Sequence, residues 1–198
     1  KMSSFVIEGG HSLKGKIKPQ GAKNEALQVI SSVLLTSGEV IIENIPNIID
    51  VNRLIEILKL IGVKINKLNY GVYSFKADEL NLEFLKSDNY RKLAKSIRGS
   101  IMIVGPLLAR FGIGSVPRPG GDKIGRRRLD THFESFKKLG AEFNYDRKES
   151  FFIVKAKKLK GSNILLDEAS VTGTANIVMT SVLADGKTSI YNAACEPY

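Results

Sequence analysis

The sequence predicts an α+β fold built from a repeated unit of helix, strand, helix, strand and strand. Three observations support this prediction: two similar segments at 52–62 and 130–140, a pair of strands after each of them, and three copies of a helix that ends near a glycine. The unit recurs at roughly 70–80 residues, which is longer than the usual solenoid repeat. The 198 residues hold about two and a half to three such units.

The second helices of the first two units are the most similar segments. They read NRLIEILKLIG at 52–62 and DTHFESFKKLG at 130–140, and the apolar residues in both return at the spacing of one buried helical stripe. Each segment closes with a glycine, Gly62 or Gly140, where the end of a helix favours a left-handed residue. Strands follow at 63–65 and 72–75 in the first unit, and at 141–143 and 151–154 in the second.

The first helix of each unit ends in two adjacent apolar residues and a nearby glycine, at 34–38, 107–112 and 182–186. The second of these helices is expected to cover the apolar run 101–109. A strand follows each helix, at 40–43, 113–116 and 188–191. The third unit has no second helix and no final pair of strands in this sequence.

We therefore expect the chain to be a piece of a longer protein. Residues 21–198 would form one domain whose third repeat is truncated. Residues 1–20 contain candidate strands at 5–8 and 16–18. These N-terminal strands would belong in part to a second domain that is absent here.

The composition is typical of a soluble globular protein, with 43% hydrophobic and 25% charged residues. Thirty Lys and Arg residues against 20 Asp and Glu residues give a net charge of +10, so anionic ligands are plausible partners. A lone cysteine, Cys195, excludes an internal disulfide. The apolar run 101–109 is far shorter than the roughly 20 residues that span a bilayer. We expect a cytoplasmic protein without a membrane partner.

Two basic segments lie where helices are expected to begin. The first is GAKN at 21–24, where backbone N–H groups at the helix start favour an anion and Lys23 adds a positive charge. Because it lacks the spacing of a P-loop, a Walker-type ATPase is disfavoured. The second is KSIR at 95–98, which precedes an apolar helix. Taken alone, the first segment is equally typical of a solvated lysine in a first helical turn. The second, taken alone, is more typical of a structural cation that caps a neighbouring acid.

The third basic segment, PRPGGDKIGRRRLDTH at 117–132, combines several glycines with a run of arginines. Its glycines let the backbone approach a ligand closely, and its three consecutive arginines, 126–128, present planar groups suited to phosphate or carboxylate. Asp130 or Thr131 is expected to cap the next helix. A solvated basic loop is the alternative interpretation.

Other classes of site find little support in the sequence. No zinc-finger, RNP or basic-zipper pattern points to nucleic acid. His11 and His132 lie far apart, and no Cys/His spacing indicates a metal site. Cys195 has no motif that would make it a nucleophile.

Together these segments resemble the enolpyruvyl transferases, in the branch that acts on UDP-N-acetylglucosamine. The resemblance covers almost the whole chain, and its motifs occur in order. They are GAKN (21–24), NIP (44–46), DV (50–51), RxS (98–100), GPLxARFG (105–112), PGGxxIG (119–125), SV (170–171) and NAAxEP (192–197), together with Arg127, Asp130 and His132.

The resemblance implies an inverse α/β domain, the first of two similar domains of three repeats each. It implies transfer of enolpyruvate from phosphoenolpyruvate to the 3′-hydroxyl of UDP-N-acetylglucosamine with release of phosphate, the first committed step of peptidoglycan synthesis. No metal or organic cofactor is implied. Because the family's active site lies between its two domains, the isolated chain is expected to be inactive. A 5-enolpyruvylshikimate-3-phosphate synthase-like transferase and a non-catalytic anion-binding module are the alternatives.

The same resemblance implies the site residues. Phosphoenolpyruvate would contact Lys23, Asn24, Arg98 and Arg127. The UDP-sugar would contact Arg98, Arg127, Arg128, Leu129, Asp130, Thr131, Ser170 and Val171.

The catalytic residue implied by the resemblance is Asp122, in the Pro-Gly-Gly loop. Most of the family carries a cysteine at this position, which acts as general acid, and some members carry aspartate. Fosfomycin inactivates the family by alkylating that cysteine as its thiolate. A carboxylate is a much poorer nucleophile, so we expect the protein to be insensitive to fosfomycin.

Overall fold

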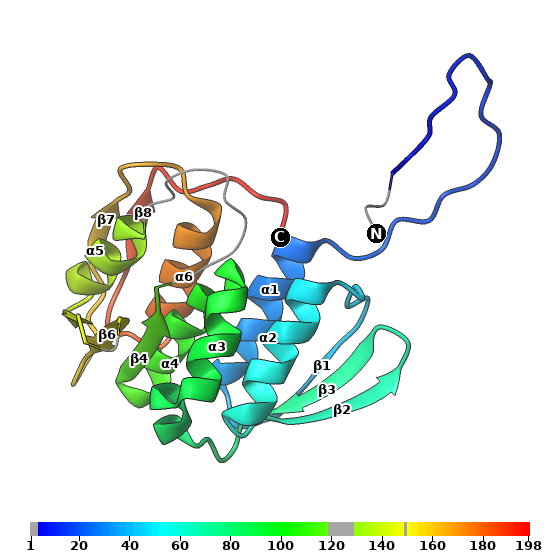
Figure 1. Cartoon of the computed structure of the whole chain (residues 1–198). Coiled ribbons are helices and arrows are strands. Elements are labelled where there is room, and N and C mark those ends of the chain that lie inside the picture. The colour runs from blue at the N-terminus through cyan, green and yellow to red at the C-terminus, as the bar shows by residue number, and fades with distance from the viewer. Residues whose placement is uncertain (1–3, 119–128, 149) are drawn as a thin grey trace.

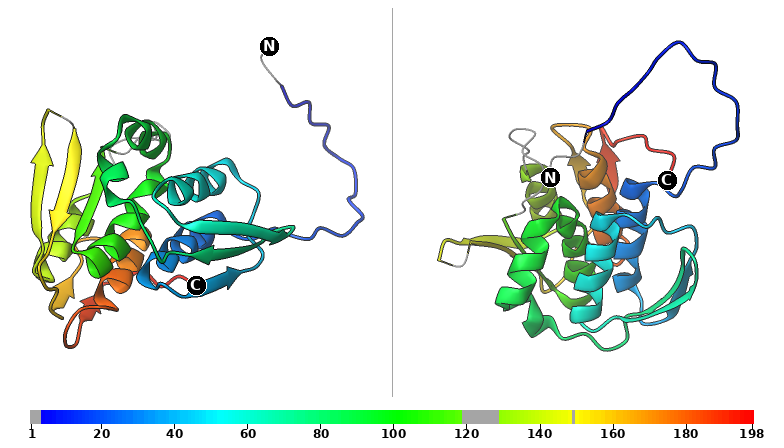
Figure 2. Two further views of the ribbon diagram at one scale, coloured as in Figure 1. Left: turned by 90° about the horizontal axis from the view of Figure 1, so that it is seen from below. Right: turned by 45° about the vertical axis from the view of Figure 1, so that its right-hand side comes forward.

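The structure, a computed structural model, describes residues 4–118, 129–148 and 150–198. Helices form the centre of the molecule, and a three-stranded antiparallel sheet lies at each of two opposite ends (Figure 1). A two-stranded parallel sheet lies beside the helices at the end of the chain. Figure 2 shows the same arrangement from two further directions. This architecture confirms the α+β prediction.

The first unit follows the predicted order. It consists of α1 (Lys23–Ser32), 3₁₀ helix η1 (Val33–Leu35), β1 (Glu39–Ile42), α2 (Ile49–Leu60), β2 (Lys64–Asn69) and β3 (Val72–Lys76). β3 lies between β1 and β2 and is antiparallel to both, so that Phe75 pairs with Val40 on one side and Ile65 on the other. The Phe75 side chain is completely buried against the helices.

The second unit repeats this topology. It consists of 3₁₀ helix η3 (Arg98–Ile103), α4 (Val104–Phe111), β4 (Ile113–Pro117), α5 (Asp130–Lys138), β5 (Glu142–Asp146) and β6 (Phe151–Lys155). β6 lies between β4 and β5, as β3 lies between β1 and β2. Gly62 and Gly140 follow α2 and α5 with positive φ values of 108° and 96°, as the repeat predicts.

The third unit contains α6 (Val171–Ser181) and β8 (Ser189–Tyr191). β8 was predicted, but its partner β7 (Asn163–Leu165) was not. Two further elements between the first and second units were also missed, the 3₁₀ helix η2 (Leu82–Lys86) and α3 (Asp88–Ser96).

Some predicted boundaries were wrong. The helix expected at 101–109 begins as the 3₁₀ helix η3 at Arg98 and becomes α-helical only at Val104. No strand forms at 5–8 or 16–18 within the described residues. Residues 4–20 instead extend away from the helices with their apolar side chains exposed (Figure 1). Whether they pair with a second domain stays a prediction.

A buried polar cluster joins the helices α4, α5 and α6 and the 3₁₀ helix η3. The Asn176 side chain on α6 accepts a hydrogen bond from the Gly105 N–H on α4 at 3.0 Å and donates one to the Ile101 carbonyl at 2.9 Å. It also lies 3.1 Å from His132 Nδ1 on α5. Both Asn176 and His132 are almost completely buried. Burial, together with the positive charge of Arg98, lowers the pKa of His132 to about 4.

Among the residues described, every helix is too short or too polar to cross a bilayer.

At Gly105 the backbone of α4 lies directly against α6, so Gly105→Ala should destabilise the fold. A Cβ at this position would lie 2.5 Å from Thr180 Oγ1 and 2.7 Å from the Asn176 carbonyl oxygen. Overpacking of this kind typically costs about 1–3 kcal/mol. Urea unfolding should show a lower midpoint at an unchanged slope. In the control Gly9→Ala the new Cβ meets nothing within 4 Å, and we expect a change below about 0.5 kcal/mol.

The low pKa of His132 predicts a pH-dependent stability. Between pH 6.5 and about 4 the unfolded chain takes up a proton on this residue and the folded chain does not. As the pH is lowered from 6.5 to about 4, the free energy of unfolding should therefore decrease by about 3 kcal/mol in total. Above pH 6.5, His132 should add nothing to the pH dependence of stability. Unfolding free energies of wild type and His132→Gln, measured from pH 7 to 4, should converge as pH falls. Parallel curves would contradict the prediction.

Candidate functional site

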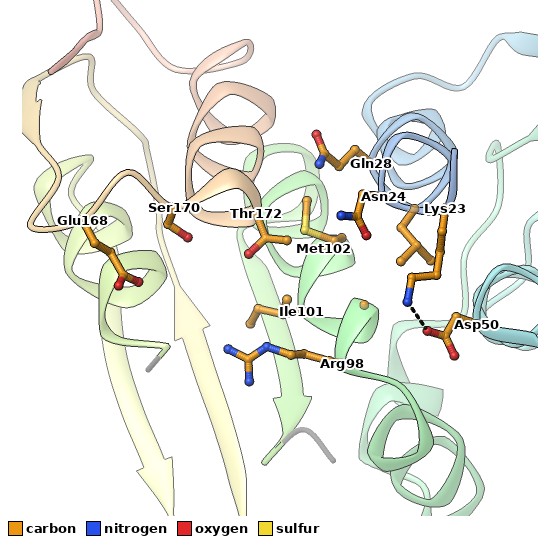
Figure 3. Close-up of a pocket in the computed structure, with 12 residues that line it drawn as sticks. Lys23, Asn24, Gln28, Asp50, Arg98, Ile101, Met102, Glu168, Ser170 and Thr172 are labelled. Atoms are coloured by element: carbon orange, nitrogen blue, oxygen red, sulfur yellow. Dashed lines mark hydrogen bonds and ion pairs between the residues drawn. The ribbon is translucent and has the colours of Figure 1, made fainter. Parts of the chain in front are cut away.

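A pocket of about 440 Å³ opens where the beginnings of α1, α6 and η3 meet (Figure 3). These elements belong to three different repeats, so residues far apart in the sequence share one cavity. Its lining consists of Lys23, Asn24, Leu27, Gln28, Asp50, Arg98, Gly99, Ile101, Met102, Glu168, Ser170 and Thr172.

The first wall is the beginning of α1. Gly21 lies directly against the Asn44 carbonyl, and a Cβ at that position would overlap this oxygen. Only glycine therefore allows the chain to pass here before the helix starts. Lys23 and Asn24 follow as the first two residues of α1, which places both side chains at the positive end of the helix dipole.

Lys23 is paired with an acid on the neighbouring helix. Its Nζ lies 3.3 Å from Asp50 Oδ2, and Asp50 belongs to the first turn of α2. The two side chains keep 46% and 36% of their surface exposed. Exposed ion pairs contribute about 0–1 kcal/mol, so an anionic ligand could compete with Asp50 for Lys23 at little cost.

The second wall is the beginning of α6. Ser170 caps this helix, because its Oγ accepts a hydrogen bond from the Gly173 N–H at 3.1 Å. Gly173 also allows α6 to approach α5, since a Cβ there would lie 3.1 Å from Thr131 Cγ2. The N–H groups of the first turn of a helix have no partner within the helix, and this end of α6 faces the pocket.

Arg98 forms the third wall at the first position of η3. It is partly buried, and its charge reaches the imidazole of His132 behind the pocket. In Figure 3, Arg98 lies between the Ser170 and Lys23 sides of the cavity. Two cations and two α-helix beginnings thus surround a space that also contains the acids Asp50 and Glu168. Such an arrangement suits a ligand that carries several negative charges and a few hydrogen-bond donors.

The structure brings together four of the predicted site residues: Lys23, Asn24, Arg98 and Ser170. Val171 instead borders a separate apolar groove between α1 and α6.

Leu129, Asp130 and Thr131 are not part of the lining of the main pocket. Thr131 is only 4% exposed and donates a hydrogen bond to Asp167 Oδ1 at 3.0 Å. The prediction that Asp130 or Thr131 caps α5 is wrong, because Leu129 holds the N-cap position and the helix begins at Asp130 itself.

Three predicted residues, Asp122, Arg127 and Arg128, lie outside the described residues, so their roles stay predictions.

Sequence reasoning missed Asp50, Glu168 and Thr172 as residues of the pocket. Asp50 belongs to a motif noted above, but its proximity to Lys23 depends on how α1 and α2 pack. Thr172 follows Ser170 and Val171 in the first turn of α6, and that position was the available signal. Within the described residues no group of three or more His, Cys, Asp or Glu side chains is placed to hold a metal ion.

Comparison with known proteins gives a consistent result. A sequence model of the EPSP synthase (3-phosphoshikimate 1-carboxyvinyltransferase) family matches residues 7–198. Proteins named UDP-N-acetylglucosamine 1-carboxyvinyltransferase from Bacteroides fragilis, Bacteroides thetaiotaomicron and Porphyromonas gingivalis are 58%, 57% and 55% identical to this chain. Each alignment covers the whole chain but 45% of the relative, so the chain spans about half the length of these proteins.

Solved structures agree on the fold at much lower sequence identity. The enolpyruvyl transferase NikO from Streptomyces tendae aligns with a TM-score of 0.73 at 18% identity, over 92% of this chain and 42% of its own. An EPSP synthase from Acinetobacter baumannii aligns with a TM-score of 0.69 at 18% identity, over 93% and 41%. The family match over residues 7–198 establishes that this chain belongs to the EPSP synthase family of enolpyruvyl transferases.

Proposed function

We propose that the protein containing this chain transfers enolpyruvate from phosphoenolpyruvate to the 3′-hydroxyl of UDP-N-acetylglucosamine, with release of phosphate. The observation that carries the proposal is the pocket in which Lys23, Asn24, Arg98 and Ser170 come together from three repeats. Relatives 55–58% identical over the whole chain bear the name of that activity. The product would serve peptidoglycan synthesis, and the enzyme would act in the cytoplasm.

The residues of the pocket fit the charges of the two substrates. Phosphoenolpyruvate carries a phosphate and a carboxylate, and Lys23 and Arg98, with Arg127 by resemblance, would neutralise them as charge develops in the reaction. Asn24 would orient the substrates. Ser170 and the beginning of α6 would face the diphosphate of the UDP-sugar.

Arg127, Arg128, Leu129, Asp130, Thr131 and Val171 complete the proposed UDP-sugar contacts. Because Thr131 is buried and bonded to Asp167, a direct contact would require that bond to be exchanged.

The proposed domain arrangement follows from the extended N-terminal segment. Residues 21–198 would be the first of two enolpyruvyl-transferase domains. Phe5 and Ile7 in the preceding segment are 95% and 89% exposed, and Ile17 is 95% exposed, which is unfavourable for apolar side chains unless another surface covers them. We assign that surface to the second domain of the same protein. The isolated chain would then lack half of the active site and would be inactive.

The substrate assignment can be tested against the nearest alternative. Full-length protein should release phosphate from phosphoenolpyruvate with UDP-N-acetylglucosamine and not with shikimate 3-phosphate. Lys23→Gln should lower kcat/KM for phosphoenolpyruvate at least 100-fold, the cost of about 3 kcal/mol for one charged contact to the substrate. Lys59→Gln, at an exposed position of α2 outside the pocket lining, is the matched control. Release with shikimate 3-phosphate alone would overturn the assignment.

The aspartate at position 122 leads to a separate prediction about fosfomycin. Wild-type full-length protein should keep its activity after long exposure to the compound, because a carboxylate attacks an epoxide far more slowly than a thiolate. Asp122→Cys should become sensitive in a time-dependent way, with a covalent adduct on residue 122 in its mass spectrum. Inactivation of the wild type with an adduct on Asp122 would refute the prediction.

A further inference from the structure

Thr172 connects the pocket to the buried polar cluster behind it. The residue lines the pocket in the first turn of α6, close to Ser170 (Figure 3). Its Oγ1 lies 3.4 Å from Nε2 of the buried His132. Whether this hydroxyl donates or accepts in that contact depends on which nitrogen of the imidazole carries the proton.

The orientation of the Asn176 amide is fixed by two backbone groups. The Gly105 N–H can only donate, so the amide atom 3.0 Å from it must be the oxygen. The Ile101 carbonyl can only accept, so the amide atom 2.9 Å from it must be the nitrogen. A flipped amide would place like groups against each other on both sides. Asn176 therefore has one N–H left to donate.

That remaining N–H determines the tautomer of His132. Asn176 Nδ2 lies 3.1 Å from His132 Nδ1, so Nδ1 is the acceptor and carries no proton. The ring is neutral near pH 7, since burial and Arg98 lower its pKa to about 4. A neutral imidazole has one N–H, which must then be on Nε2. This N–H points to Thr172 Oγ1, and the threonine accepts.

Thr172 is thereby left with a hydroxyl hydrogen to donate. Within the described residues its Oγ1 makes no hydrogen bond other than the contact with His132. The oxygen borders the pocket, beside Arg98 and the positive end of α6, where an anionic oxygen is the favoured acceptor. The chain of bonds from Gly105 through Asn176 and His132 orients this donor towards the cavity.

We propose that Thr172 is a substrate-binding residue whose hydroxyl donates a hydrogen bond to a phosphoryl oxygen. The proposal rests on the proposed function, in which both substrates carry such oxygens: the diphosphate of UDP-N-acetylglucosamine and the phosphate of phosphoenolpyruvate. His132 and Asn176 are positioning residues in this scheme, because they do not touch the ligand but set the direction of the hydroxyl.

The test compares Thr172→Val and Thr172→Ser in the full-length protein. Valine keeps the shape but cannot donate, and a lost hydrogen bond to a charged group corresponds to about a tenfold weaker ligand. Calorimetric titration with UDP-N-acetylglucosamine and the KM for phosphoenolpyruvate identify which substrate supplies the oxygen. We expect about a tenfold loss for one substrate, less than twofold for the other, and less than twofold for both in Thr172→Ser.

Several outcomes would overturn the proposal. If Thr172→Val changes neither the affinity for UDP-N-acetylglucosamine nor the KM for phosphoenolpyruvate, Thr172 is not a donor to either substrate. An equal weakening for both substrates would indicate a structural effect. A similar weakening in Thr172→Ser would indicate the same. If the wild-type protein does not release phosphate from phosphoenolpyruvate and UDP-N-acetylglucosamine together, the proposed function is refuted instead. An independent measurement remains in that case: ¹⁵N chemical shifts of His132 should show a protonated Nε2 and an unprotonated Nδ1. The opposite tautomer would overturn the inference whatever the substrate.

Discussion

The close contact between α4 and α6 is the interaction on which the site depends. Gly105 has no side chain, so α6 packs against the backbone of α4 and the Asn176 amide reaches both the Gly105 N–H and the Ile101 carbonyl. In a buried environment each of these groups would cost about 1–3 kcal/mol if left unpaired. The amide therefore fixes the positions of η3 and α6 relative to each other, and Arg98 and Ser170 lie at the beginnings of those two elements.

The electrostatics of the pocket follow from the repeat. Each unit directs the beginning of its first helical segment to the same place, as α1, as the 3₁₀ helix η3 and as α6. The positive ends of the two α-helices attract anions there. Lys23 and Arg98 add full charges, while Asp50 and Glu168 offset part of this field. Because the Lys23–Asp50 pair is half exposed, it keeps the lysine near the pocket without binding it tightly.

Periodic features were predictable from the sequence, and features that depend on long-range packing were not. The apolar stripes of α2 and α5 and the glycines after them predicted both units, because each signal lies within a dozen residues. Helix α3 was missed since only Tyr90 and Ala94 are buried in it, although Ser87 capping the Tyr90 N–H was a usable signal. Asp50 and Thr172 were missed because their partners are 27 and 40 residues away.

The position of Thr131 shows why a family motif alone does not define a formed site. The motif continues through Leu129, Asp130 and Thr131 into α5, yet the packing that buries His132 also turns Thr131 towards Asp167, with Gly173 of α6 against its methyl group. A residue held this way cannot meet a ligand without giving up a bond. The beginnings of α1, η3 and α6 have no such conflict, because their polar side chains border the pocket while apolar residues anchor the same elements in the core. The pocket walls that these three elements carry are therefore held in place by the packing of the fold itself.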